Sequence, residues 1–582
     1  MDRRTFLALF LTALVIVFTP MIFRGFGARS AAPVSATRDS AALANGAGAS
    51  TAATAAGQTN PPAPAQPMTP AIGAPSPAVA APTVARRAAD TIGVDASKTR
   101  YTFSTAGAAP QAVVLNAYRH LGASARGQTK AMLLGTVPGT PSPAGLLHYR
   151  LVRGADTVAL DTVPFRAERT ADGVTFTSSG AVPVTIRYQF ANDGYVAHVS
   201  GQVGGSSSNA TTQLLVDLPQ TLRSQEADTL DDERHLAYGY KLEHEDVKSV
   251  SFTKLDPTMV RTDSGPMTWV ATRNKYFLVA LVAPSPSTSF LAVRMQGGPR
   301  VGKQAPSAFA TAVQPVKDGR FGFDLYTGPQ SWQQLRAVGH DLENVNPYGG
   351  WIPGVQPFAT ICMRVLLWMK QTLNVSYGWV LIIFGIAVRL LLWPLNQSAM
   401  RSSLKMQRIQ PELAEVQKRY KSDPEKQREA LVKLYQQHGM SPFSPIMGCL
   451  PMLLPMPVLF ALFFVFQNTI EFRGVSFLWL PDLSLRDPYY IMPIFMGVSM
   501  FVLSWIGMRA APPNPQTKMM SYMMPAVMTM VLLNFASGLN LYYAVQNIAA
   551  LPQQWMLSRE RMKAAPPVAA ASPPLRSRRA TT

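Results

Sequence analysis

One arginine lies within an otherwise apolar stretch of this chain, and it is the residue with the clearest chemical potential. Arg389 is the only charged side chain of residues 380–394, and a guanidinium in hydrocarbon costs about 2.5–3.5 kcal/mol on insertion scales. Arginines in such settings usually face a water-filled cavity or a polar partner. A second interpretation stays open, because Arg389 lies only about 9 Å from the inner end of the stretch and its side chain can extend toward water.

Motifs for covalent chemistry are missing from the sequence. It contains no nucleophile elbow, P-loop or dinucleotide-binding fingerprint. Five histidines fall between residues 120 and 244, but none has metal-ligand spacing to another on one element. The two cysteines, Cys362 and Cys449, imply no disulfide framework. We therefore predict that the protein is not an enzyme and that it uses no cofactor and no metal.

Methionine and polar side chains gather in the same C-terminal part of the chain. Residues 440–535 hold 14 of the 27 methionines, and flexible methionine surfaces suit a site that accepts many apolar partners. Simple gap-filling in a helical bundle is the alternative. Asn540 and Gln546 are among the polar residues near the last two apolar runs, where they leave room for water.

Six apolar runs have the length of bilayer-spanning helices. The first, Phe6–Phe23, follows two arginines and is interpreted as an uncleaved anchor within residues 1–27, in preference to a cleaved or twin-arginine signal. The others are 17–19 residues long, roughly 25–29 Å as helices. They are Tyr377–Leu395, Leu450–Gln467, Tyr490–Gly507, Met519–Phe535 and Leu539–Leu557. We therefore predict a polytopic α-helical membrane protein with six spans and both termini in the cytoplasm.

Basic residues flank these runs. Residues 396–444 carry nine basic and five acidic side chains, and residues 556–582 carry six and one, as expected for cytoplasmic segments. Residues 400–439 have the pattern of a helical hairpin, with Asp423 as an N-cap and Gly439 as a stop. The basic side chains that we single out in this hairpin are Arg401, Lys405, Arg408, Lys418 and Arg419. The chain ends in a basic cytoplasmic tail, residues 559–582.

The remaining segments complete the domain organisation. Residues 28–91 are rich in Ala and Pro and predict a disordered linker. Residues 92–345 show short alternating runs broken by turn residues, which predict a large β-sandwich domain that ends in a helix over residues 331–344. An amphipathic interfacial helix at 358–373 then opens a five-span core over residues 346–558.

Several short motifs resemble those of one known family. In the membrane half they are Gly378-Trp379, Val388-Arg389, Trp393-Pro394-Leu395, Met447-Gly448-Cys449-Leu450-Pro451, Met456-Pro457, Asp487–Ile494, Pro525–Met528, Ser537-Gly538-Leu539 and Leu541-Tyr542-Tyr543. Gly328-Pro329 and Tyr348-Gly349 add a likeness in the β-rich segment. Together these motifs resemble the YidC-type membrane protein insertases in their Gram-negative form.

The resemblance implies an inner-membrane protein with a periplasmic β domain and a hydrophilic groove, open to cytoplasm and lipid, that inserts and folds membrane proteins without covalent chemistry. The groove arginine and tyrosine fall on Arg389 and Tyr543, and Trp393, Asn540 and Gln546 are further candidates. The family's usual Gln in the third span is Pro455 here. The implied partners are nascent membrane proteins, the Sec translocon, membrane lipids and the ribosome, which the basic tail and the hairpin would contact through RNA phosphates.

Two other classes of function stay open at this point. A transporter would show repeat symmetry or a ligand site near the membrane midplane, and neither is visible in the sequence. A membrane-anchored enzyme that acts on periplasmic glycans would need a cleft with two convergent carboxylates in the β domain.

Overall fold

The computed structural model of the 582-residue chain describes residues 90–564, apart from short internal gaps. The gaps are residues 123–128, 135–144, 179–181, 205–211, 347, 349–354, 395–396, 398–408, 410–411, 414, 421–422, 439–455 and 510–514. The predicted N-terminal anchor and nearly all of the predicted linker lie outside the described residues, and so does the basic tail beyond residue 564.

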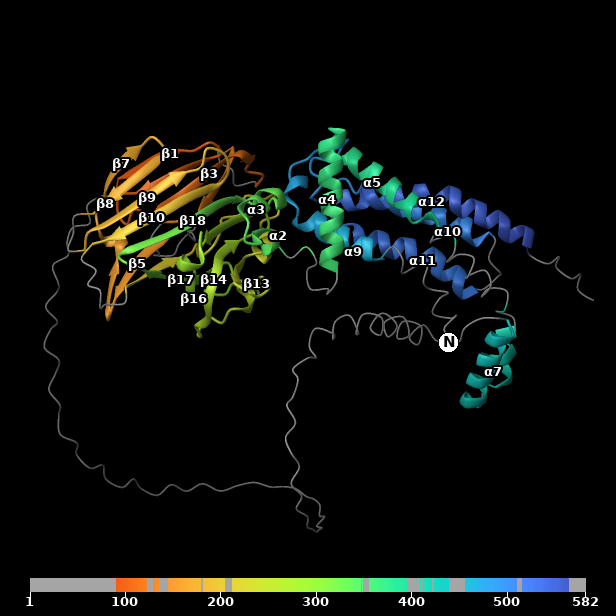
Figure 1. The fold of residues 1–582 in the computed structure, drawn as a ribbon. Helices are drawn as coiled ribbons and strands as arrows, with labels where there is room; N and C mark the ends of the chain where they lie inside the picture. Colours follow the sequence, from red (N-terminus) through yellow and green to blue (C-terminus); the bar gives the residue numbers. More distant parts are fainter. Residues whose placement is uncertain are drawn as a thin grey trace, which may run out of the picture. The chain divides into compact units, whose positions relative to one another are not determined.

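A β-rich domain forms the first part of the described chain (Figure 1). Its small sheet has the order β1-β2-β3-β4, and its large sheet has the path β6-β5-β11-β17-β16-β14-β15-β18-β10-β9-β8-β7, with β12 and β13 attached through β14. The strands are β1 Thr91–Asp95, β2 Thr99–Ser104, β3 Pro110–Arg119, β4 Lys130–Leu134, β5 His148–Arg153, β6 Asp156–Ala159, β7 Arg166–Thr170, β8 Gly173–Thr177, β9 Val184–Phe190, β10 Val196–Val203, β11 Thr212–Asp217, β12 Ala237–Leu242, β13 Lys248–Ser251, β14 Arg261–Arg273, β15 Phe277–Val282, β16 Phe290–Gly297, β17 Ala308–Val316 and β18 Arg320–Pro329.

Local sequence explains the strands that were predicted. The β9–β10 hairpin pairs Ala197 with Phe190 in antiparallel register, and the turn between the strands contains Gly194, whose φ of 125° suits glycine. In β9 the side chains alternate between buried and half-buried, as its alternating sequence predicts. Every residue of the apolar β15 is buried, because this strand lies between β14 and β18 in the sheet.

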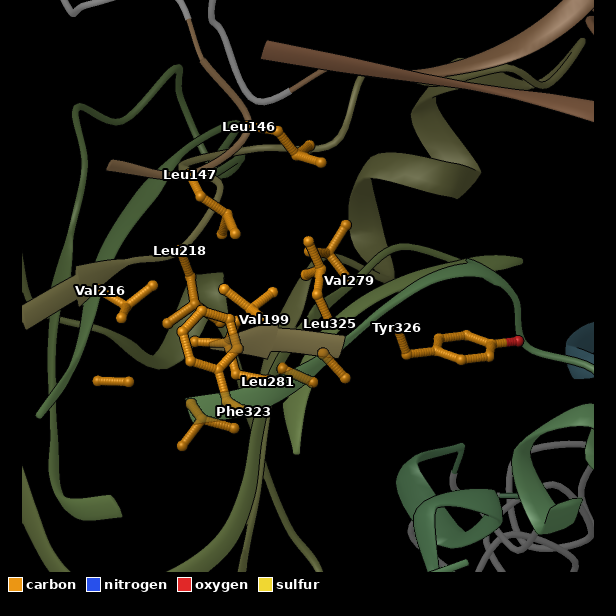
Figure 2. Packing of buried hydrophobic residues seen from close by; sticks show 14 of the residues in the cluster. Leu146, Leu147, Val199, Val216, Leu218, Val279, Leu281, Phe323, Leu325 and Tyr326 are labelled. Atoms are coloured by element: carbon orange, nitrogen blue, oxygen red, sulfur yellow. The ribbon is translucent and has the colours of Figure 1, made fainter. Parts of the chain in front are cut away.

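The two sheets share one hydrophobic core. Phe103 of the small sheet packs against Tyr188 of the large sheet, with 4.6 Å between ring centroids. Figure 2 shows part of this core, where the ring of Phe323 lies among aliphatic side chains that include Val199 and Leu218. Because both sheets bury apolar faces against each other, the domain is stabilised as one unit, and the predicted β-rich domain is confirmed.

The helix predicted over residues 331–344 is shorter in the structure. The helix α3, Trp332–Val338, ends at Gly339, and the chain resumes a single 3-10 turn at Leu342–Val345. Gly339, His340 and Asp341 all have positive φ, which no α-helix continues through. A second short helix, α2 (Thr229–Arg234), lies between β11 and β12.

Apolar helices make up the second part of the described chain (Figure 1). They are α4 Val355–Leu373, α5 Tyr377–Leu391, α9 Met456–Asn468, α10 Ile491–Met508, α11 Pro515–Leu532 and α12 Ser537–Ala564. Among the described residues, α10 is the helix that is long and apolar enough to cross a bilayer alone, and α4 with α5 forms a pair that is bent by 119°. The C-terminal helical region is confirmed, and the count of six spans stays a prediction.

The predicted cytoplasmic hairpin is described in part. Its second helix, α7 (Pro424–Gln437), begins as predicted, because the side chain of Asp423 accepts a hydrogen bond from the backbone N–H of Lys426 at 3.2 Å. Residues 415–419 are helical in the first arm. His438 and Glu412 connect the two arms, with 2.9 Å between Nε2 and Oε2.

The turn after α9 connects the helices to the β domain. Ile470 is buried in the core of the β domain, whereas Phe472 is buried in the core of the helices. Arg473 follows Phe472 in the chain, and its guanidinium donates to both carboxylate oxygens of Glu226 at 2.8 and 2.9 Å. The side chains of this ion pair are only 3% and 7% exposed. Ile470, Phe472 and Arg473 therefore contribute side chains to both halves of the described chain.

Candidate functional site

Arg389 lies in the last turn of α5 and turns toward α12. Its Nη2 donates a hydrogen bond to Oε1 of Gln553 on α12, over 2.8 Å. Its Nε is buried and has no hydrogen-bond partner among the described residues. No salt bridge to Arg389 occurs within the part of the chain that the structure describes. The guanidinium is therefore held by a neutral amide that leaves its charge in place.

Gln553 contacts both α5 and the residues that follow it. While its Oε1 accepts from Arg389, its Nε2 donates to the backbone oxygen of Trp393 at 3.2 Å. Trp393 thus contributes a backbone carbonyl, one of the groups that the end of a helix leaves unpaired. Its indole is half-buried. The end of α5 and the charged side chain on it are both attached to one residue of α12.

Gln546 makes the equivalent connection about two turns earlier on α12. Its Nε2 donates to the backbone oxygen of Gly385 at 2.8 Å and to the Tyr542 hydroxyl at 3.0 Å. Gly385 allows this close approach, since a Cβ there would lie 3.0 Å from Cγ1 of Val545. The pairs 385 with 546 and 389 with 553 show that α5 and α12 run in the same direction.

The other two predicted residues of α12 lie in different surroundings. Tyr543 is half-buried, and its hydroxyl is buried without a hydrogen-bond partner among the described residues. Asn540 is fully buried, and its Nδ2 donates to the backbone oxygen of Leu532 at 3.1 Å. Thirteen residues separate Asn540 from Gln553, roughly 20 Å along a helix. The structure therefore brings Gln546 close to α5 and places Asn540 at the turn between α11 and α12.

The predicted hairpin residues are described in part. Lys418 and Arg419 are exposed on the first arm, where basic side chains are free to meet an anionic partner. Arg401, Lys405 and Arg408 lie outside the described residues, and Pro455 does as well. Their roles stay predictions.

Sequence reasoning missed Gln553. Other polar residues of the last span were singled out because they are amides in an apolar run, and Gln553 fits the same criterion. The available signal was helical spacing, because Gln546 and Gln553 are seven residues apart and therefore share one face of α12. That face meets α5 at both positions.

The site holds an unneutralised cation between two apolar helices. Exposed apolar side chains surround it on α5, including Ile386, Leu390 and Leu391. Such an arrangement attracts negative charge or backbone carbonyls through a medium of low dielectric constant, where the attraction is strong. It offers no nucleophile and no acid–base pair beside the arginine among the described residues.

Comparisons with known proteins identify the family of the chain. The family model described as the YidC periplasmic domain matches residues 91–361, and the model described as 60Kd inner membrane protein matches residues 368–565. A membrane protein insertase YidC of Chlorobaculum tepidum is 32% identical over 68% of this chain and 69% of its own length. One of Anaeromyxobacter sp. (strain Fw109-5) is 35% identical over 53% of this chain and 54% of its own length. A crystal structure of an active YidC insertase matches 81% of this chain and 93% of its own chain, at 18% identity and a TM-score of 0.33.

A periplasmic-type β domain followed by apolar helices defines a class of inner-membrane proteins with a large domain outside the bilayer. Within that class the assignment is specific, since both family models and the curated relatives agree. The chain belongs to the YidC family of membrane protein insertases.

Proposed function

We propose that this protein inserts hydrophobic segments of nascent proteins into the inner membrane, and that Arg389 attracts the polar or acidic flank of each segment. The observation that carries the proposal is the hydrogen bond from Arg389 to the neutral Gln553 at 2.8 Å, with no carboxylate in contact among the described residues. A guanidinium that had to be neutral in lipid would be expected beside a carboxylate. A free charge between α5 and α12 instead has the properties of a docking point.

The physical cost that such a site reduces is dehydration. A segment that enters lipid must carry its polar flank past hydrocarbon, at several kcal/mol for each unsatisfied group. A hydrophilic groove that is hydrated toward the cytoplasm and open to lipid along its side lowers that cost in two stages. The segment first enters the groove, and it then moves sideways into lipid. Tyr543 and Gln546 would line the groove together with Arg389. No covalent bond is made or broken.

Helix directions support a membrane topology of six spans. The α5 and α12 helices run in the same direction, and so do α10 and α12, where Asn547 donates to Ser499 and Ser558 donates to the backbone oxygen of Ile506. The α11 helix runs opposite to α10, since Gly497 approaches Thr529 while Phe501 contacts Tyr522. An N-terminal anchor followed by alternating spans would give these directions, with both termini in the cytoplasm and the β domain in the periplasm.

The remaining partners belong to the same proposal. The exposed Lys418 and Arg419 of the hairpin would meet incoming chains or ribosomal RNA, and the basic tail would add phosphate contacts. Contact with lipid follows from the exposed apolar side chains of α10, such as Phe495 and Val498. Cooperation with the Sec translocon would extend the range of substrates.

The test compares two client proteins that differ only in acidic or neutral residues of the translocated flank. Arg389→Ala should lower the inserted fraction of the acidic client more than that of the neutral client, by roughly fivefold at most for a partly screened charge. Arg389→Lys should keep most activity, because a sliding substrate cannot hold one bidentate geometry. Equal insertion of both clients in wild type and Arg389→Ala, at matched protein levels, would exclude the proposed role.

A further inference from the structure

We infer that Gln553 is the positioning residue for Arg389, and that its amide is suited to the task because it holds the guanidinium without cancelling its charge. The inference rests on the proposed function of Arg389 and adds a second residue to it. Gln553 lies 164 positions from Arg389 in sequence, on a different helix.

The amide of Gln553 is fixed in one orientation. The residue is only 3% exposed, and both ends of its side chain are used: Oε1 accepts from Arg389, and Nε2 donates to the Trp393 carbonyl. Turning the amide over would place its NH₂ against the donating Nη2 and its oxygen against the Trp393 oxygen. Both contacts would then be repulsive, so the two bonds determine the orientation together.

The hydrogen bond restrains a side chain that is otherwise free to leave the site. The arginine side chain has many accessible rotamers, and Arg389 lies close enough to the end of α5 to extend toward water. The hydrogen bond from Gln553 to the Trp393 carbonyl fixes the Gln553 side chain within the contact between the two helices. Gln553 therefore stays in place when the Arg389 side chain changes rotamer. Arg389 is therefore kept at a constant depth, where an incoming segment meets it.

The neutrality of the partner matters as much as its position. A carboxylate in place of the amide would have almost the same shape and would accept the same hydrogen bond from Arg389, but it could not donate to the Trp393 carbonyl. Because an opposite charge within about 4 Å stabilises the ionised form of each partner, Arg389 and a glutamate at 553 would form an ion pair with no net charge. An acidic flank would then meet a site with no net charge, even though Arg389 keeps its hydrogen-bond partner.

Gln553→Glu is consequently the decisive variant, and the neighbouring residue supplies its control. Gln554 lies on the same helix but faces α10, where its Nε2 is 2.5 Å from the position that a Cβ on Gly507 would occupy. Gln554→Glu therefore adds the same charge to the same helix on another face. We expect Gln553→Glu to lower the ratio of acidic-client to neutral-client insertion by roughly fivefold, close to Arg389→Ala, while Gln554→Glu keeps the wild-type ratio.

Exchange of the two residues provides a second measurement. The double variant with Arg389→Gln and Gln553→Arg keeps one arginine and one glutamine in contact and moves the charge from α5 to α12. We expect it to recover more than half of the acidic-client insertion that Arg389→Ala loses. A merely structural role of Gln553 would change both clients equally and would leave their ratio unaltered.

The outcomes separate the inference from the proposed function. If Arg389→Ala changes the client ratio but Gln553→Glu does not, Arg389 acts without Gln553 and the inference is overturned. A ratio that changes equally in Gln553→Glu and Gln554→Glu would also overturn it, since any negative charge on α12 would then suffice. If Arg389→Ala itself leaves the ratio unchanged, the proposed function fails, and the inference fails with it.

Discussion

At the scale of single residues, the molecule contains arginines that are partly or fully buried. Two arginines are held in opposite ways. Arg389 is bound by a neutral amide and keeps its charge, whereas Arg473 is bound by the carboxylate of Glu226 and loses it to an ion pair. The first arrangement suits a site that must attract something else. The second connects the β domain to the loop after α9, and it is an ion pair only while the Glu226 carboxyl is ionised.

Glu226 gives a prediction about pH. Burial raises the pKa of its carboxyl from 4.5 to about 7, although the charge of Arg473 opposes the rise. The folded state therefore binds this proton more tightly than the unfolded state does. The resulting stabilisation is fully present below about pH 4.5 and is lost as the pH rises through about 7.

Since glutamine cannot titrate, the melting temperature of wild type relative to Glu226→Gln should fall across that range of pH. The corresponding free energy is on the order of 3 kcal/mol. The measurement is Tm of both proteins in detergent at a series of pH values, with the exposed Asp246→Asn as control. Parallel curves for wild type and Glu226→Gln would show that Glu226 does not titrate between these limits.

At the scale of elements, small residues allow the helices to approach each other and their connecting loops. Gly378 at the start of α5 lies against the ring of Phe477, in the loop before α10. A Cβ on Gly378 would come within 2.1 Å of Cδ2 of that ring, which is too close for any contact. Phe477 is itself buried and packs edge-on against Trp379, with 5.7 Å between centroids. The ring has little room to move aside.

Gly378→Ala should therefore destabilise the helical core. Overpacking of this kind typically costs about 1–3 kcal/mol, because side chains and backbone must shift. The exposed Ala387 on the same helix provides the control, since Ala387→Val adds volume where nothing is displaced. Thermal unfolding followed by size-exclusion chromatography in detergent measures both. A melting temperature of Gly378→Ala equal to that of wild type would mean that the loop before α10 yields easily.

At the scale of the whole molecule, the turn after α9 determines how firmly the β domain is attached to the helices. Arg473 donates to Glu226 and also to the backbone oxygens of Arg119 and Gln225, and its guanidinium lies 5.3 Å from the centroid of the Phe277 ring. One arginine thus contacts the β3 end, the segment before α2 and the start of β15. Removing it would leave Glu226 buried without a counter-charge.

Arg473→Ala should separate the unfolding of the two halves. Above about pH 7, where Glu226 is ionised, breaking a buried ion pair by removal of one partner typically costs about 3–5 kcal/mol, and here that cost falls on the connection itself. Calorimetry of the variant should show the β domain and the helices unfolding at clearly different temperatures, where wild type shows a smaller separation. Arg486→Ala, which removes an exposed side chain 3.5 Å from Asn534, should have little effect. An unchanged thermogram for Arg473→Ala would show that apolar contacts such as Ile470 suffice.

The local elements could be predicted from the sequence, because they follow from patterns within a few residues. Alternating apolar residues predicted the β9–β10 hairpin, and the Asp423-Pro424 pair predicted the start of α7. Apolar runs predicted the helices, and one charge within such a run identified Arg389. Motif likeness predicted the family, and the comparisons confirmed it.

Which amide meets Arg389 depends on how α5 and α12 pack in three dimensions. The sequence offered several amides on α12. Helical spacing shows that Gln546 and Gln553 share a face, but not which amide meets Arg389, because that depends on the rotation and offset of α5 and α12. Asn540 and Gln553 are both amides in the last apolar run of the sequence. In the structure Asn540 donates to the backbone oxygen of Leu532, whereas Gln553 accepts a hydrogen bond from Arg389. The ion pair of Arg473 with Glu226 joins residues 247 positions apart and could not be predicted from the sequence either. Local patterns do not indicate which distant surface a loop contacts.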